Sequence, residues 1–219
     1  MNKTRKTYAV NVGGVKIGSA NPVVVQSMCN APAEDFDANL KQINELADAG
    51  CELVRVSVPS ENALKTFTEL CKKSPVPLIA DIHFSPSLAI KAIEAGASKI
   101  RINPGNLGGL EKTNEIITCA IKHKVPIRIG VNAGSLDEEL KCRSDLSLPE
   151  KLAESAKQYV DYFNDHDFKD IVVSLKAHDV NTCVEANRIF AKACPEVPLH
   201  LGITEAGTKD QGIIKSAAG

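Results

Sequence analysis

A short apolar strand followed by a helical segment recurs along the chain, and this repeat most limits the possible folds. Strand-like segments rich in Val and Ile begin near Pro22, Glu52, Pro77, Lys99, Pro126, Asp170 and Pro198. Apolar residues between them fall at helical spacing, as in the segment that follows the expected N-cap Ser85 and Pro86. Alternating strands and helices predict a parallel sheet built from βαβ units.

The spacing of these segments predicts a (β/α)8 TIM-type barrel that is truncated before its eighth strand. The unit repeats about every 29 residues, which fits a βαβ crossover. An eighth strand would start near residue 227, whereas the sequence ends at Gly219. The alternative, an open doubly wound sheet, usually has a Gly-rich turn after its first strand, and the sequence there is Cys29-Asn30-Ala31-Pro32. We therefore expect residues 1–219 to form one incomplete barrel.

Polar residues alternate with apolar ones in the predicted strands, although strands buried on both faces are normally apolar throughout. Arg101 and Asn103 share one face of their strand, and Ile100 and Ile102 share the other. In a barrel the polar alternates face the lumen, and the active site lies at the carboxyl ends of the strands. The same alternation places these residues on the inner face: Arg55, Ser57, Asp81, His83, Arg128, Gly130, Asn132, Ser174, Lys176, His200, Gly202 and Thr204.

The predicted lumen carries more cations than anions. Arg55, Arg101, Arg128 and Lys176 stand against the carboxylates Asp81 and Glu205, an excess of +2. Burying unbalanced cations is costly, so an anion with two or more charges is expected there, most consistently a diphosphate. A single strand arginine is usually solvated, and it is the recurrence on several strands that indicates a site. Lys99 and Lys169 precede strands and are expected to face solvent, while His83 or His200 alone would be a core histidine.

Composition argues against several classes of binding partner. The net charge of −1 gives no reason to expect a nucleic acid, and no apolar run is long enough to predict a membrane span. The seven cysteines contain no C-x-x-C pair, so no local metal or iron–sulfur site is indicated. Reduced thiols in a cytoplasmic protein are the simplest interpretation.

Four longer motifs at the predicted strand ends match a known family. They are Ala80-Asp-Ile-His-Phe84, Arg101-Ile-Asn-Pro-Gly-Asn106, residues 128–136 (RIGVNAGSL) and residues 200–207 (HLGITEAG). With residues 23–28 (VVVQSM) and 54–59 (VRVSVP), they resemble 4-hydroxy-3-methylbut-2-enyl diphosphate synthase, which depends on flavodoxin or ferredoxin. The resemblance runs from about Thr4 to the last residue.

The resemblance implies an activity in the methylerythritol phosphate route to isoprenoids. The family reductively opens 2-C-methyl-D-erythritol 2,4-cyclodiphosphate, with loss of water, to hydroxymethylbutenyl diphosphate. Electrons from flavodoxin or ferredoxin reach the substrate through a [4Fe-4S] cluster, held by three Cys and a Glu of a separate C-terminal domain that acts across a homodimer. None of the seven cysteines here matches a cluster ligand. We therefore expect that the iron–sulfur domain is absent and that this chain alone is inactive.

The resemblance also assigns roles to residues. Arg55, Arg101, Arg128 and Lys176 resemble the family's diphosphate-contacting cations, and Asn132 and His200 its polar contacts. Asp81 resembles a further pocket acid, and Glu205 the carboxylate near the reacting carbon skeleton, which makes it the candidate catalytic residue. The chain departs from the family at Cys29, where Thr is frequent, and at residues 85–87, where an acidic and a basic residue often occur.

Two other functions remain open from the sequence. The chain is similar in its predicted architecture to the pterin-binding synthases, which are also anion-binding barrels, although their own motifs are not evident. The second alternative is that the chain is a non-catalytic truncated fragment. Binding of the cyclodiphosphate but not of a pterin diphosphate would separate the leading interpretation from the first of these.

Overall fold

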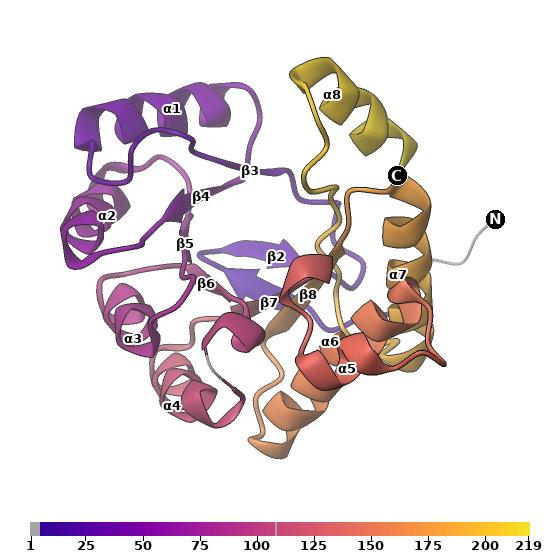
Figure 1. The fold of residues 1–219 in the computed structure, drawn as a ribbon. Coiled ribbons are helices and arrows are strands. Elements are labelled where there is room, and N and C mark those ends of the chain that lie inside the picture. The colour runs from indigo at the N-terminus through magenta and orange to yellow at the C-terminus, as the bar shows by residue number, and fades with distance from the viewer. Residues whose placement is uncertain (1–4, 108) are drawn as a thin grey trace.

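A curled parallel sheet forms the centre of the computed structural model, which describes residues 5–107 and 109–219 (Figure 1). Thr4, where the family resemblance begins, lies outside the described residues. Each strand of the sheet is hydrogen-bonded to the next one along the chain, as βαβ units require. The strands are β3 (Gln26–Met28), β4 (Leu53–Ser57), β5 (Leu78–Asp81), β6 (Lys99–Ile102), β7 (Ile127–Asn132) and β8 (Ile171–Lys176).

Helices surround the convex face of this sheet (Figure 1). They are α1 (Phe36–Asp48), α2 (Glu61–Lys73), α3 (Pro86–Glu94), α4 (Asn114–His123), α5 (Glu138–Cys142), α6 (Leu148–Asp165), α7 (Val180–Ala193) and α8 (Lys209–Ala218), with short 3-10 turns at Pro104–Leu107, Glu111–Thr113 and Ala133–Ser135. Several begin at a polar N-cap whose side chain accepts a backbone N–H, including the predicted Ser85 before Pro86.

The main core lies between the helices and the outward face of the strands. Ile100, Ile102 and Ile129 are fully buried there, and Phe67 and Phe163 belong to the same apolar cluster. This arrangement confirms the α/β class and the prediction that the apolar alternates of the strands face the helices. The polar alternates are left to the concave side.

The seventh predicted strand forms only in part. The backbone N–H of Val173 donates to Pro198 O at 3.1 Å, and that of His200 donates to Val173 O at 2.8 Å. Leu199 therefore makes a single parallel bridge to β8 instead of a regular strand. On its other side, no described strand pairs with the segment around Leu199. The segment therefore lacks the second set of backbone hydrogen bonds that an inner strand of a sheet makes. The sheet is an open half-barrel (Figure 1). Val23 and Leu201 are exposed and line the same cavity.

An antiparallel hairpin that sequence reasoning missed closes the amino-terminal end of the sheet. It consists of β1 (Val10–Val12) and β2 (Val15–Ile17), and it lies across the middle of the curled sheet (Figure 1). Gly13 and Gly14 form its turn with φ values of 58° and 98°, conformations that favour glycine. The Gly13-Gly14 pair between two short segments of alternating apolar residues could have predicted this hairpin.

The hairpin forms an apolar floor under the lumen. Val10 and Val12 pack against Leu53, Ile79 and Val172, and all five side chains are fully buried. Leu53, Ile79 and Val172 each lie two residues before a polar alternate of the same strand. The concave side of the sheet therefore has an apolar layer below and a polar layer above, toward the carboxyl ends of the strands.

We expect Val12→Ala to lower the free energy of unfolding by about 2 kcal/mol, because it removes buried methyl groups from this floor. Val23→Ala is the matched control, since the Val23 side chain is 92% exposed. That control should change stability by less than about 0.5 kcal/mol. Urea unfolding followed by circular dichroism measures both, and equal effects would contradict a packing role for the hairpin.

Candidate anion-binding site

Cationic side chains from four strands converge on the polar layer of the lumen. Arg55 is on β4, Arg101 on β6, Arg128 on β7 and Lys176 on β8, as the alternation predicts. The strand register makes Arg101 and Arg128 direct neighbours and pairs Lys176 with Asn132. Arg101 and Arg128 are buried, with only 6% and 1% of their surface exposed.

Asp81 is the carboxylate at the centre of this group. Its Oδ1 lies 3.2 Å from Nη1 of Arg101, and its Oδ2 lies 3.6 Å from Nε of Arg55. His83 Nε2 is 3.4 Å from the same Oδ2, so this histidine belongs to the polar layer. Burial raises the pKa of Asp81, but the hydrogen bond from His83 and the charges of Arg101 and Arg55 outweigh burial and lower the pKa to about 2. Asp81 is therefore ionised at neutral pH.

Arg128 and Arg101 carry buried donors that none of the described residues satisfies. Nε of Arg128 donates to Oγ of Ser174 at 3.0 Å. Nη1 of Arg128 and Nε of Arg101 are buried and, among the described residues, have no hydrogen-bond partner. An unsatisfied buried donor is costly, and for a charged group the cost is larger. These two nitrogen atoms are therefore donors available to an anionic ligand.

Two glycines make room for the cations. A Cβ atom on Gly130 would lie 2.8 Å from Nε of Arg101, and one on Gly202 would lie 3.1 Å from Nζ of Lys176. Both contacts are closer than side chains normally tolerate. Gly130 and Gly202 are polar-face alternates of their segments, so a side chain there would occupy the space of the neighbouring ammonium or guanidinium group.

The prediction that Lys99 faces solvent is wrong. Its side chain is fully buried, and Nζ donates to Oε1 of Gln26 at 3.3 Å. The register places it beside Ile79, in the apolar layer below the arginines. Burial, followed by the charges of Arg128 and Arg55, lowers the pKa of Lys99 to about 7. The sequence pattern could have predicted this burial, because Lys99 lies two residues before Arg101 and so shares its face of the strand. Lys169 is exposed, as expected.

The cations also lower the pKa values of their neighbours. Burial, followed by Arg128, Arg55 and Arg101, lowers the pKa of Lys176 to about 7. Burial and then the charges of Arg128 and Lys176 lower the pKa of His200 far below its usual range, which keeps its imidazole neutral. The site therefore has a strongly positive potential, which an anionic ligand would relieve.

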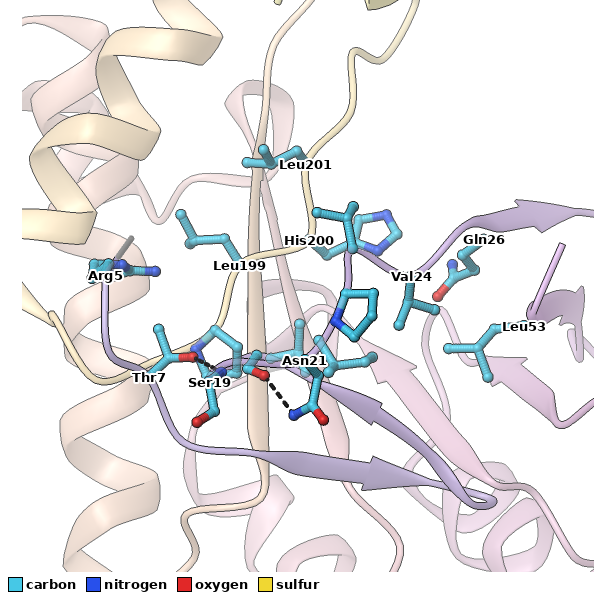
Figure 2. A pocket seen from close by; sticks show the side chains of 16 residues that line it. Arg5, Thr7, Ser19, Asn21, Val24, Gln26, Leu53, Leu199, His200 and Leu201 are labelled. Carbon is cyan, nitrogen blue, oxygen red and sulfur yellow. Dashed lines mark hydrogen bonds between the residues drawn. The ribbon is translucent and has the colours of Figure 1, made fainter. Parts of the chain in front are cut away.

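A cavity lies next to this layer, at the open side of the sheet. It has a volume of about 470 Å³, and Leu199, His200 and Leu201 form one of its walls. Figure 2 shows Arg5 at one end of the cavity and Gln26 at the other, with His200 between them. Among its described lining residues, Arg55, Arg101 and Arg128 are absent, so His200 is the sequence-predicted site residue that faces this cavity.

Asn132 and Glu205 occupy different surroundings. Asn132 ends β7, and its backbone N–H donates to Oγ of Ser135 in the following turn at 3.4 Å. Asn103 donates to Oγ of the same Ser135 at 2.7 Å, which ties the ends of β6 and β7 together. Glu205 is exposed in the loop before α8, in a left-handed conformation with φ of 51°. The structure thus does not bring Glu205 into the cation layer.

An iron–sulfur cluster does not fit the residues described. A [4Fe-4S] cluster held as the resemblance implies would need three cysteines near one another. Within residues 5–107 and 109–219, the one group of three metal-ligating side chains is Glu94, Cys119 and His123, which contains a single cysteine.

Several solved structures of dihydropteroate synthases share this architecture. The Xanthomonas albilineans enzyme in complex with 4-aminobenzoic acid superimposes with a TM-score of 0.65 at 14% identity, covering 97% of this chain and 87% of that one. The Yersinia pestis enzyme with a sulfonamide drug gives a TM-score of 0.66 at 12% identity, covering 91% of this chain and 80% of that one. At this identity the likeness shows the fold alone.

Curated relatives share far more sequence. The chain is 52% identical to the 4-hydroxy-3-methylbut-2-en-1-yl diphosphate synthase (flavodoxin) of Natranaerobius thermophilus, over 100% of this chain and 61% of that protein. It is 48% identical to the Bacillus subtilis protein of the same name, over 98% of this chain and 56% of that protein. The chain thus spans about 60% of these relatives' length. Residues 7–219 match the GcpE TIM-barrel domain, and the chain therefore belongs to that family.

Proposed function

We propose that this chain is the substrate-binding barrel of an oxidoreductase that converts 2-C-methyl-D-erythritol 2,4-cyclodiphosphate to 4-hydroxy-3-methylbut-2-enyl diphosphate. The observation that carries the proposal is the buried cation layer with Asp81 as its central carboxylate. Buried cations without counterions are strongly unfavourable, so a layer of this kind is expected to bind a multiply charged anion. The names of the curated relatives supply the identity of that anion's class, a diphosphate.

In this proposal the arginines recognise the diphosphate oxygens. Nη1 of Arg128 and Nε of Arg101 are buried donors without partners among the described residues, and they gain charge-assisted hydrogen bonds when the ligand enters. Lys176 contributes a point charge at the end of β8, while Arg55 is oriented by Asp81 and by Met28, whose Sδ lies 2.8 Å from Nη2. Asn132 and the neutral His200 supply polar contacts without adding charge.

Glu205 is proposed as the catalytic residue of the complete enzyme. Its carboxylate would orient a hydroxyl group or move a proton as water leaves the substrate. A non-glycine residue in the left-handed region is uncommon and often marks a functional loop. Glu205 lies between Gly202 and Gly207, so the loop has the backbone freedom to carry the carboxylate toward the lumen.

The proposal assigns the redox half of the reaction to parts of the enzyme outside these residues. A C-terminal domain would supply the [4Fe-4S] cluster, flavodoxin or ferredoxin the electrons, and a homodimer the complete active site. Flavodoxin has support from the relatives' names. Cytoplasmic localisation is part of the same proposal; among the described residues no helix is long and apolar enough to cross a membrane.

Arg128→Met tests the binding role directly. We expect the affinity for the cyclodiphosphate to fall about 10- to 100-fold, because charge-assisted hydrogen bonds are lost. Thermal stability should be kept or increased, because the variant removes a buried, partly unsatisfied cation. Isothermal titration calorimetry and a melting curve measure the two effects.

Arg188→Met is the matched control, since Arg188 is exposed on α7. It should leave the affinity unchanged. A pterin diphosphate should not bind the unaltered chain; if it binds as tightly as the cyclodiphosphate, the proposed substrate is wrong.

Diphosphate binding should weaken as the pH rises above 7. A bound anion favours the ammonium form of Lys176, whose pKa in the free protein is lowered to about 7, so binding takes up a proton above that pH. Titration of inorganic diphosphate between pH 6.5 and 9 should show this trend more strongly in the unaltered chain than in Lys176→Met. The ligand's own ionisation is the same for both proteins, so parallel pH profiles would rule out the role of Lys176.

In a complete enzyme that contains this barrel and a cluster domain, Glu205→Gln should lower kcat by about 100-fold or more, while substrate affinity is largely retained. Asp210→Asn, an exposed acid in the first turn of α8, is the control and should behave as the unaltered enzyme. Reduction of the cyclodiphosphate with dithionite as the electron source measures turnover. Unchanged turnover in Glu205→Gln would eliminate the catalytic role.

A further inference from the structure

Three side chains of metal-ligating types meet at the carboxyl-terminal ends of α3 and α4. Glu94 is the last residue of α3, and Cys119 and His123 lie on α4. One ligand atom from each, a carboxylate oxygen, Sγ and an imidazole nitrogen, lies within 4.8 Å of the other two. The two helices are neighbours on the outside of the sheet (Figure 1). This group is separate from the lumen cations.

The spacing on α4 suits a shared metal ion. Cys119 and His123 are four residues apart, so they project from the same face of the helix, as pairs of metal ligands on one helix do. Glu115 is four residues before Cys119 and lies on that same face. All four residues line one surface cavity of about 360 Å³ between α3 and α4.

The local electrostatics favour a cation. Both helices end here, and the carboxyl-terminal end of a helix carries a partial negative charge. Glu94 and Glu115 add two carboxylates to the same cavity, against the single ammonium group of Lys122. Among the described residues, Glu94, Cys119 and His123 form no ion pair or side-chain hydrogen bond that a metal would have to displace.

The ligand types select zinc. A thiolate, an imidazole and a carboxylate are the ligands that Zn²⁺ takes in tetrahedral sites, whereas Mg²⁺ and Ca²⁺ prefer oxygen ligands alone. Zinc bonds of about 2.0 to 2.3 Å place neighbouring ligand atoms roughly 3.5 Å apart. Small rotations of the exposed Glu94 and His123 side chains close the remaining gap.

We propose that Glu94, Cys119 and His123 bind a Zn²⁺ ion that joins α3 to α4, with Glu115 or water in the fourth position. The helix carboxyl ends lie at the opposite end of the barrel from the strand carboxyl ends, so the ion is remote from the anion site. Its role is structural. It ties together the helices that follow β5 and β6, the strands that carry Asp81 and Arg101.

The test uses the purified chain after removal of metal with EDTA. Zn²⁺ added in competition with a chromophoric chelator should bind at one site per chain and raise the melting temperature. Glu94→Gln, Cys119→Ser and His123→Ala should each weaken Zn²⁺ binding about tenfold or more. Cys142→Ser and His178→Ala remove an exposed thiol and an exposed imidazole elsewhere and should have no effect.

Alkylation read by peptide mass spectrometry gives an independent measurement. Zn²⁺ should protect Cys119 from iodoacetamide, leave Cys142 reactive, and lose its protective effect in His123→Ala. The buried Cys183 should stay unmodified throughout, which confirms that every variant is folded. Binding of Zn²⁺ with equal affinity in Cys119→Ser, or equal alkylation of Cys119 with and without Zn²⁺, would overturn the proposal.

Discussion

The carboxylate of Asp81 lies between the guanidinium groups of Arg55 and Arg101, and the charge balance of the lumen depends on it. Cations this close repel one another, and this repulsion adds to burial in lowering the pKa values of Lys99 and Lys176. One ionised acid neutralises part of that charge and orients two arginines at once. The remaining positive charge has no counterion among the described residues, and in the proposed function an anionic ligand supplies it.

The fold separates this charge from the part of the lumen that provides stability. Below the arginines, the hairpin residues Val10 and Val12 pack against Leu53 and Val172 and exclude water. Above them, the strands end in short turns tied together by Asn103 and Ser135 at 2.7 Å. The apolar floor and the tied strand ends hold the guanidinium groups in position, as the proposed binding of a diphosphate requires.

Sequence patterns predicted the α/β class, the alternation of faces and the convergence of the arginines, because period-two patterning depends only on local strand geometry. Lys99 was misjudged because a lysine at the start of a strand is usually solvated, and its burial depends on the neighbouring β3 and β5. The regular strand expected after Pro198 is reduced to a bridge, since strand formation requires partners that a local pattern does not reveal. The exposed position of Glu205 likewise depends on loop conformation, which sequence spacing does not determine.

Gly130 and Gly202 show that the cation layer depends on positions that carry no side chain. Neither glycine bears a functional group, yet a single methyl group at either position would occupy the volume needed by the head group of Arg101 or Lys176. A survey that ranks positions by the chemistry of their side chains would pass over both. A side chain at either glycine would therefore push the neighbouring cation out of its present position, so an engineered barrel intended for a larger or less charged ligand would have to redesign these positions together with the cations.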